Sequence, residues 1–250
     1  MAQEPRRRSA RVVRFLQARL SPEGYLGLHL TVGMLLIILT CWSFGEIAED
    51  LSTRGWLASM DQHAAEAFRQ VVTPDLTRLV KGVTFLGSVG FLTAVSVSVA
   101  LVLALKRALY RFFAFALTMA GGSVLNVALK HLFHRERPVL ENPLVTLASY
   151  GFPSGHTMGT TLLCGSIAIL AASAGTGFGA RVLFFALAAL WVAIIGATRI
   201  YLGAHYFTDV IGAITAGVAW LTLCWTAVET LRRWRRRHWR PAVPAQEARS

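Results

Sequence analysis

Long apolar stretches alternate with short polar segments along the whole chain of 250 residues. Six of these stretches come close to the length of about 17–25 residues that lets an apolar helix cross a membrane. They cover residues 26–44, 83–105, 112–129, 158–174, 182–197 and 210–228. The pattern predicts an all-α, polytopic membrane protein with six transmembrane helices. The alternative is a soluble all-helical protein, which would have to bury six near-spanning helices within one short chain.

Composition agrees with the membrane interpretation. Hydrophobic residues make up 54% of the chain and the mean hydropathy is +0.51, whereas soluble domains are usually about 45–50% apolar with glycine included. The first apolar stretch starts too late and is too long for a secretory signal peptide. The sequence therefore predicts one six-span domain over residues 26–230, a basic arm over 1–25 and a basic tail over 231–250.

The placement of charge predicts how the chain is oriented. Six arginines precede the first apolar stretch, and six more lie in the segment RRWRRRHWR that follows the last. Cytoplasmic segments carry the excess of Lys and Arg, so we expect both termini in the cytoplasm of a plasma-membrane protein. Such basic ends suit anionic lipid headgroups, and no nucleic-acid partner is expected. Residues 130–157 and 198–209 should then lie outside the cell, so an active site built from these segments should face the extracytoplasmic side.

The first outer loop contains an amphipathic pattern over residues 60–72, MDQHAAEAFRQVV. Its apolar positions have helical spacing, which predicts a helix lying on the outer surface. Asp61, His63 and Glu66 are expected to form its solvated polar face. Thr73 and Pro74 are typical of the start of the next helix.

Two outer segments suggest a site for an anion. The segment KHLFHRERP brings the cations Lys130, Arg135 and Arg137 to the outer end of the third span, against the usual distribution of positive charge. The segment GFPSGHTMGT predicts a helix start, with Ser154 as N-cap, Gly155 allowing close approach of a ligand, and His156 in the first turn. Free backbone N–H groups at a helix start favour an anion. The alternatives are a snorkelling basic cluster and a capped helix that carries a lone histidine.

The third outer segment, TRIYLGAHYFTD, adds Arg199 and a histidine–carboxylate pair. His205 and Asp209 are four residues apart, so their side chains can meet on one helix face. A carboxylate bonded to one ring nitrogen fixes the tautomer and raises the basicity of the other nitrogen, which suits a nucleophile or base. A structural pair at the start of the sixth span is the alternative. The predicted topology brings all three segments to one membrane face, where converging ionisable groups indicate a functional site.

The ordered motifs resemble the type 2 phosphatidic acid phosphatase family, the lipid phosphate phosphatases related to vanadium haloperoxidases. They are Lys followed by six residues and Arg-Pro, then Pro-Ser-Gly-His, then Arg, five residues, His, three residues and Asp. The motifs span residues 130–209, and the six-span layout extends the likeness over most of the chain. One departure is Thr198, where the family usually has serine.

The resemblance implies a mechanism and a set of roles. His205 would attack phosphorus and form a phosphohistidine, Asp209 would orient it, and His156 would protonate the leaving oxygen and then activate water. The phosphoryl oxygens would be bound by Lys130, Arg137, Ser154, Gly155 and Arg199. Arg135 is a further candidate contact, while Glu136 is expected to pair with a neighbouring cation.

We expect no metal and no other cofactor, because cations can neutralise a phosphoryl group and no Asp/Glu cluster adjoins the motifs. The expected substrate is a membrane lipid phosphate or diphosphate, such as undecaprenyl diphosphate, phosphatidate or phosphatidylglycerol phosphate. A phosphotransferase using the same intermediate is one alternative. A lipid-binding membrane protein with a vestigial site is another.

Overall fold

The computed structural model describes residues 28–53, 55–138, 144–145 and 147–238. Within these ranges the chain forms helices and connecting segments and no strand. The helices are α2 (Leu28–Thr53), α3 (Trp56–Gln70), α4 (Pro74–Phe85), α5 (Val89–Leu105), α6 (Leu109–Ala116), the π-helical η1 (Leu117–Gly121), α7 (Gly122–Phe133), α8 (Gly155–Ala172), α9 (Phe178–Tyr201) and α10 (Phe207–His238). The predicted arm 1–25 and residues 239–250 of the predicted tail lie outside the described residues. Residues 231–238 of that tail continue α10.

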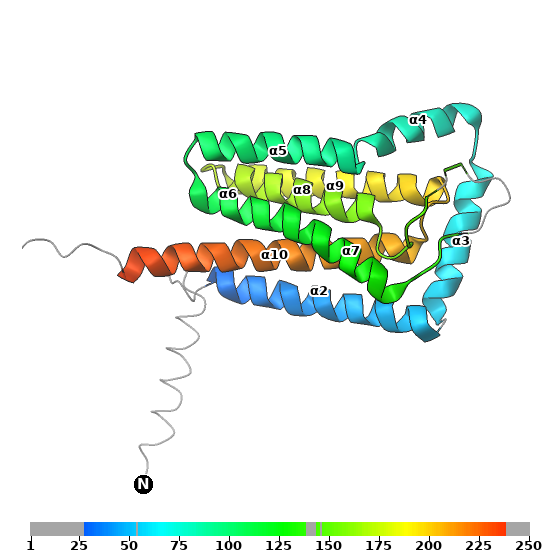
Figure 1. Ribbon diagram of the computed structural model, residues 1–250, viewed down its shortest axis with the longest axis horizontal. Coiled ribbons are helices and arrows are strands. Elements are labelled where there is room, and N and C mark those ends of the chain that lie inside the picture. The colour runs from blue at the N-terminus through cyan, green and yellow to red at the C-terminus, as the bar shows by residue number, and fades with distance from the viewer. Residues whose placement is uncertain (1–27, 54, 139–143, 146, 239–250) are drawn as a thin grey trace, which may run out of the picture.

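The six-span, all-helical prediction is confirmed. Six helical stretches are long and apolar enough to cross a membrane: His29–Leu51, Pro74–Leu105, Leu109–Phe133, Gly155–Ala172, Phe178–Tyr201 and Phe207–His238. The second stretch is broken between α4 and α5, where the Ser88 hydroxyl accepts a hydrogen bond from the Phe91 N–H and starts a new helix. As Figure 1 shows, α4 consequently runs in a different direction from α5.

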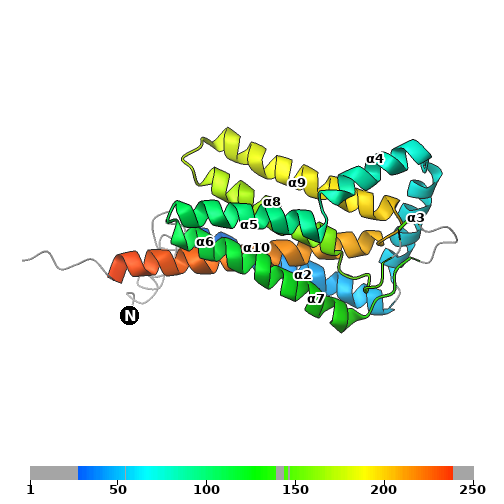
Figure 2. The same ribbon diagram turned by 45° about the horizontal axis from the view of Figure 1, so that its top comes forward.

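The long helices form a bundle in which α10 packs along α2 and α8, and α8 packs along α9 (Figures 1 and 2). At one end of this bundle, α3 lies across the ends of the long helices and contacts α2, α9 and α10. The start of α2 and the end of α10 lie at the opposite end. The bundle therefore has one end covered by α3 and one end at which the described chain begins and finishes.

The helix expected on the outer loop exists as α3, and it packs onto the bundle through its apolar side. Phe68 makes an edge-on ring contact with Tyr201 of α9, at 6.4 Å between centroids. Thr73 starts α4 as predicted, because its hydroxyl accepts a hydrogen bond from the Leu76 N–H and Pro74 takes the first helical position. The Tyr201 hydroxyl bonds Thr77 at 3.0 Å, which joins α4 to the end of α9.

An aromatic cluster fixes the segment that enters α8. The fully buried Phe152 lies 5.6 Å from the ring of Phe44 and 4.9 Å from that of Phe133, so it packs against α2 and α7 together. Gly212 of α10 leaves room for the Phe152 ring, which occupies the place where a Cβ would be. Full burial of such a ring contributes about 1.5–3 kcal/mol, and it positions the adjoining residues at the end of the bundle beneath α3.

Candidate active site

The three polar segments that the sequence singled out meet beneath α3. One follows α7, one begins α8, and one joins α9 to α10. The backbone N–H of Ser154 donates to the carbonyl of Asp209 at 3.0 Å, which ties the start of α8 to the start of α10. Gly151 donates likewise to the carbonyl of Arg135 at 2.7 Å. Backbone contacts thus hold all three segments together.

His205 lies in the turn before α10 and is 3% exposed. Its Nδ1 is 3.3 Å from Asp209 Oδ2, and its Nε2 is 3.1 Å from Nη1 of Arg137. A guanidinium has no acceptor, so Nε2 must accept this hydrogen bond and Nδ1 must carry the proton. Burial lowers the pKa of His205 to about 4, although the hydrogen bond from Nδ1 to Asp209 and the Asp209 charge oppose this shift. The imidazole is therefore neutral at neutral pH, and its Nε2 lone pair faces the basic side of the site.

Asp209 is fully buried and accepts hydrogen bonds on both of its carboxylate oxygens. Besides His205, Oδ2 accepts from the Tyr206 N–H at 2.9 Å, and Oδ1 accepts from Arg135 at 2.5 Å. The bond to Tyr206 reaches back to the residue just before α10, in the manner of the capping box. The same carboxylate therefore starts the helix and orients the histidine.

Backbone carbonyls hold two of the predicted cations. Arg137 donates to the carbonyls of Ser149 and Ala204, both at 2.6 Å, and Lys130 donates to the carbonyl of Tyr150 at 2.6 Å. Carbonyl oxygens orient these side chains without neutralising their charge. Both cations consequently keep their charge for a ligand.

Arg199 is 3% exposed and lies at the end of α9. Its Nη1 donates to the Thr84 hydroxyl of α4 at 3.0 Å, while its Nε is buried without a hydrogen-bond partner. No carboxylate pairs with it in the part of the chain that the structure describes. An unpaired buried charge is costly, so Arg199 indicates a site that takes an anion.

The start of α8 differs in one detail from the prediction. Ser154 occupies the N-cap position, but its side chain makes no capping bond, and its hydroxyl instead accepts a hydrogen bond from Thr157 at 3.0 Å. Gly155 faces Asn126 of α7, whose Oδ1 would lie 3.3 Å from an added Cβ. Asn126 belongs to none of the three motifs, so sequence analysis alone could not identify it.

His156 is half-buried in the first turn of α8 and interacts electrostatically with Lys130, Arg137, Arg199 and His205. Its ring makes no hydrogen bond with any of the described residues. The structure therefore brings every predicted site residue into one cluster and leaves the His156 ring available to a ligand.

The expectation that Asp61 is solvated was wrong. Asp61 is 3% exposed, and it accepts hydrogen bonds from Arg135 at 2.7 Å and from the Thr208 N–H at 2.8 Å. Arg135 thus bridges Asp61 and Asp209 and stacks over the Tyr206 ring at 4.5 Å, so its role is structural. Helical spacing alone could not distinguish Asp61 from Glu66, because the partner of Asp61 comes from a distant segment.

Replacing Asp61 tests this bridge. Asp61→Ala should lower the free energy of unfolding by about 3 kcal/mol, because it leaves Arg135 and the Thr208 N–H without their shared carboxylate. Glu66→Ala is the matched control, since Glu66 is exposed on the same helix, and it should not change stability measurably. Unfolding in detergent measures both variants. Equal losses in the two would contradict the bridge.

Comparison with known proteins places this site in a family. Residues 111–233 match the PAP2 superfamily. The chain is 27% identical over 180 residues to phosphatidylglycerophosphatase B of Bacillus subtilis, covering 72% of this chain and 88% of that protein.

Two solved structures have similar folds. One is a transmembrane PAP2-type phosphatidylglycerolphosphate phosphatase from Bacillus subtilis, with a TM-score of 0.68, 26% identity, and coverage of 75% of this chain and 93% of that one. The other is LpxE of Aquifex aeolicus, with a TM-score of 0.51, 23% identity, and coverage of 68% and 94%. The family model spans most of the polar cluster and the helices that carry it, and residues 111–233 therefore form a PAP2 superfamily domain.

Proposed function

We propose that this protein hydrolyses a phosphate or diphosphate ester of a membrane lipid through a phosphohistidine formed on His205. The observation that carries the proposal is the buried Arg199, which has no carboxylate partner among the described residues and faces the same site as the neutral His205. A phosphoryl group would supply the missing negative charge. The relatives that act on phosphatidylglycerol phosphate support the same reaction class.

The charge of the site suits a phosphoryl dianion. Arg135 is bound by Asp61 and Asp209, and this trio carries one net negative charge. Three further cations surround it: Lys130, Arg137 and Arg199. The cluster therefore has two positive charges in excess. Positioning and charge neutralisation are the main contributions of a protein to phosphoryl transfer.

In the first step, the Nε2 lone pair of His205 attacks phosphorus. A P–N bond forms while the P–O bond to the leaving group breaks, and Asp209 stabilises the positive charge that develops on the ring. Arg137 shifts its hydrogen bond from Nε2 to a phosphoryl oxygen. Protonated His156 donates a proton to the leaving oxygen. Its ring can take this role because it makes no hydrogen bond with any of the described residues.

In the second step, His156 takes a proton from a water molecule, which attacks the phosphohistidine. The P–N bond breaks, phosphate leaves, and His205 returns to its neutral form. Ser154 and the Gly155 N–H lie at the start of α8 and would bind the phosphoryl oxygens there. The cations perform the neutralisation that Mg²⁺ provides in other enzymes, so the proposed reaction needs no metal.

A groove beside the site fits the lipid part of the substrate. It has a volume of about 380 Å³, lies between α5, α7 and α8, and includes Asn126 and Gly155 at its site end. Its walls are mostly apolar, and exposed Val97 and Val127 flank it. An acyl or prenyl chain can occupy such a groove while its phosphate reaches His205. Phosphatidylglycerol phosphate, phosphatidate and undecaprenyl diphosphate are the proposed substrate candidates.

Phosphate release tests the reaction. Purified protein in detergent with EDTA should release phosphate from at least one of these lipids, and His205→Ala should be slower by at least about 1000-fold because it lacks the nucleophile. Release that requires added metal would contradict metal independence. Label from the lipid appearing in an acceptor instead of free phosphate would identify a transferase. No release by wild type with any lipid would contradict the hydrolase.

A substitution in the groove tests the lipid site. Ser96 lines the groove and its hydroxyl is buried without a partner, so Ser96→Phe should fill the space. We expect kcat/KM for a long-chain lipid phosphate to fall about tenfold or more, the scale of a lost apolar contact, while hydrolysis of soluble p-nitrophenyl phosphate stays unchanged. Ser98→Phe is the control, because Ser98 is exposed on α5 outside the groove. Equal effects on both substrates would point to general damage to the fold.

We also propose that α3 and the site face the outside of the plasma membrane and that both termini are cytoplasmic. The arginines before α2 and at the end of α10 support this orientation, and the start of α2 and end of α10 lie at the same end of the bundle (Figure 1). A reporter fused after Ser250 should be cytoplasmic. Glu66→Cys should react in intact cells with a membrane-impermeant maleimide, and protection of this cysteine would overturn the orientation.

A further inference from the structure

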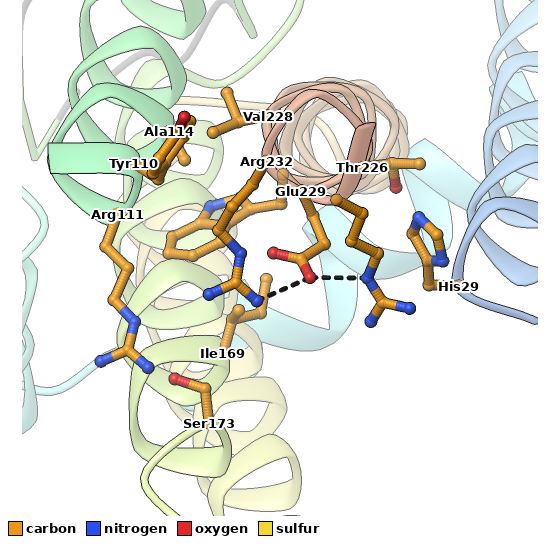
Figure 3. Close-up of a pocket in the computed structure, with 12 residues that line it drawn as sticks. His29, Tyr110, Arg111, Ala114, Ile169, Ser173, Thr226, Val228, Glu229 and Arg232 are labelled. Atoms are coloured by element: carbon orange, nitrogen blue, oxygen red, sulfur yellow. Dashed lines mark hydrogen bonds and ion pairs between the residues drawn. The ribbon is translucent and has the colours of Figure 1, made fainter. Parts of the chain in front are cut away.

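A second cavity lies at the other end of the bundle, away from His205. Its volume is about 370 Å³, and it is bounded by the starts of α2 and α6, the end of α8 and the last turns of α10 (Figure 3). Since a helix rises about 1.5 Å per residue, Glu229 lies roughly 30 Å along α10 from Asp209. That distance matches the hydrocarbon thickness of a bilayer, about 30 Å. The cavity therefore lies at the opposite membrane boundary from the candidate active site.

Arginine side chains predominate on the polar side of this cavity. Glu229 accepts hydrogen bonds from Arg232 and Arg233, both at 2.7 Å, so one carboxylate is shared between two cations. Arg111 lines the cavity from α6 and forms no ion pair within the described ranges. Figure 3 shows the side chains of Arg111 and Arg232 extending over Ile169 and Ser173 of α8. An anion between these arginines would balance the charge.

Unpaired donors lie in the same cavity. The Nε of Arg232 and the Nε1 of Trp225 are both buried without a hydrogen-bond partner. Each carries an N–H that can only donate. Buried polar groups of folded proteins nearly always have a partner, so two unpaired donors beside one cavity indicate an acceptor that the protein itself does not supply.

Apolar side chains, among them Ala114, Ile169 and Val228, form much of the remaining wall of the cavity. Large apolar side chains are exposed nearby on α6 and α10, namely Leu109, Phe113 and Leu231. A ligand with both an anionic group and hydrocarbon chains fits this combination. Anionic phospholipids collect near basic segments at a membrane surface.

We propose that this cavity binds the phosphate-bearing headgroup of an anionic membrane lipid, with the phosphate between Arg111 and Arg232 and the acyl chains along the adjoining apolar surface. The site is separate from the His205 centre, and the bound lipid is not a substrate. The bound lipid contacts α2, α6, α8 and α10 at the end of the bundle that α3 does not cover.

Lipid binding to the full-length protein tests the proposal. Native mass spectrometry of the detergent-solubilised protein should measure the Kd of the first bound phosphatidylglycerol molecule, with phosphatidylcholine as the neutral comparison. Arg111→Gln should weaken phosphatidylglycerol binding by about tenfold, the effect of losing one hydrogen bond to a charged group. Arg232→Gln should weaken it similarly. Lys106→Gln is the matched control, because Lys106 is an exposed cation at the same end that does not line the cavity.

The outcomes separate the possibilities. Weaker binding in the two arginine variants alone, with phosphatidylcholine binding unchanged, would support the site. Equal weakening in Lys106→Gln would mean a diffuse surface effect and overturn it, as would unchanged binding in Arg111→Gln. Displacement of phosphatidylglycerol by millimolar inorganic phosphate in an Arg111-dependent manner would assign the site to free phosphate and overturn the lipid. Arg111→Gln should keep its phosphate-release rate, which shows that the variant is folded.

Discussion

The buried bridge from Asp61 through Arg135 to Asp209 connects the elements on which the candidate site depends. Arg135 has a carboxylate on each side, at 2.7 and 2.5 Å, and both carboxylates are nearly or fully buried. Removing charges from water costs several kcal/mol per ion, and the cost is recovered only when each charge is paired and fully hydrogen-bonded. The bridge meets this condition through Thr208 and Tyr206. It anchors α3 over the site and fixes the carboxylate that orients His205.

The cations around His205 consequently divide into two kinds. Arg135 has its charge more than neutralised, whereas Lys130 and Arg137 are held by neutral carbonyl oxygens and Arg199 by a hydroxyl. Pairing by neutral groups orients a cation without removing its attraction for an anion. The histidine stays neutral in their midst because burial lowers its pKa. A neutral imidazole beside several cations is the arrangement on which the proposed attack on a phosphoryl group depends.

The two ends of α10 contribute to different tasks within one helix. Asp209 in its first turn serves the His205 centre, and Glu229 near its end shares a basic cavity with arginines. The length of α10 separates them by about the thickness of a bilayer. The proposed lipid chemistry at one end of α10 and the proposed lipid binding at the other can therefore be examined by separate substitutions.

The sequence alone was sufficient to predict the six spans, because apolar runs of membrane length can form few stable structures other than membrane-spanning helices. It also predicted that Lys130, His156, Arg199 and His205 lie together, since six spans bring alternate loops to one face. It could not predict that Asp61 is buried while Glu66 on the same helix is exposed. Local periodicity shows which residues share one face of a helix. Whether a carboxylate on that face can be buried depends on a cationic partner, and the partner of Asp61 is Arg135, from a segment far away in the chain. The division of the arginines into structural and ligand-facing ones likewise depends on distances between segments, and only the tertiary structure fixes those distances.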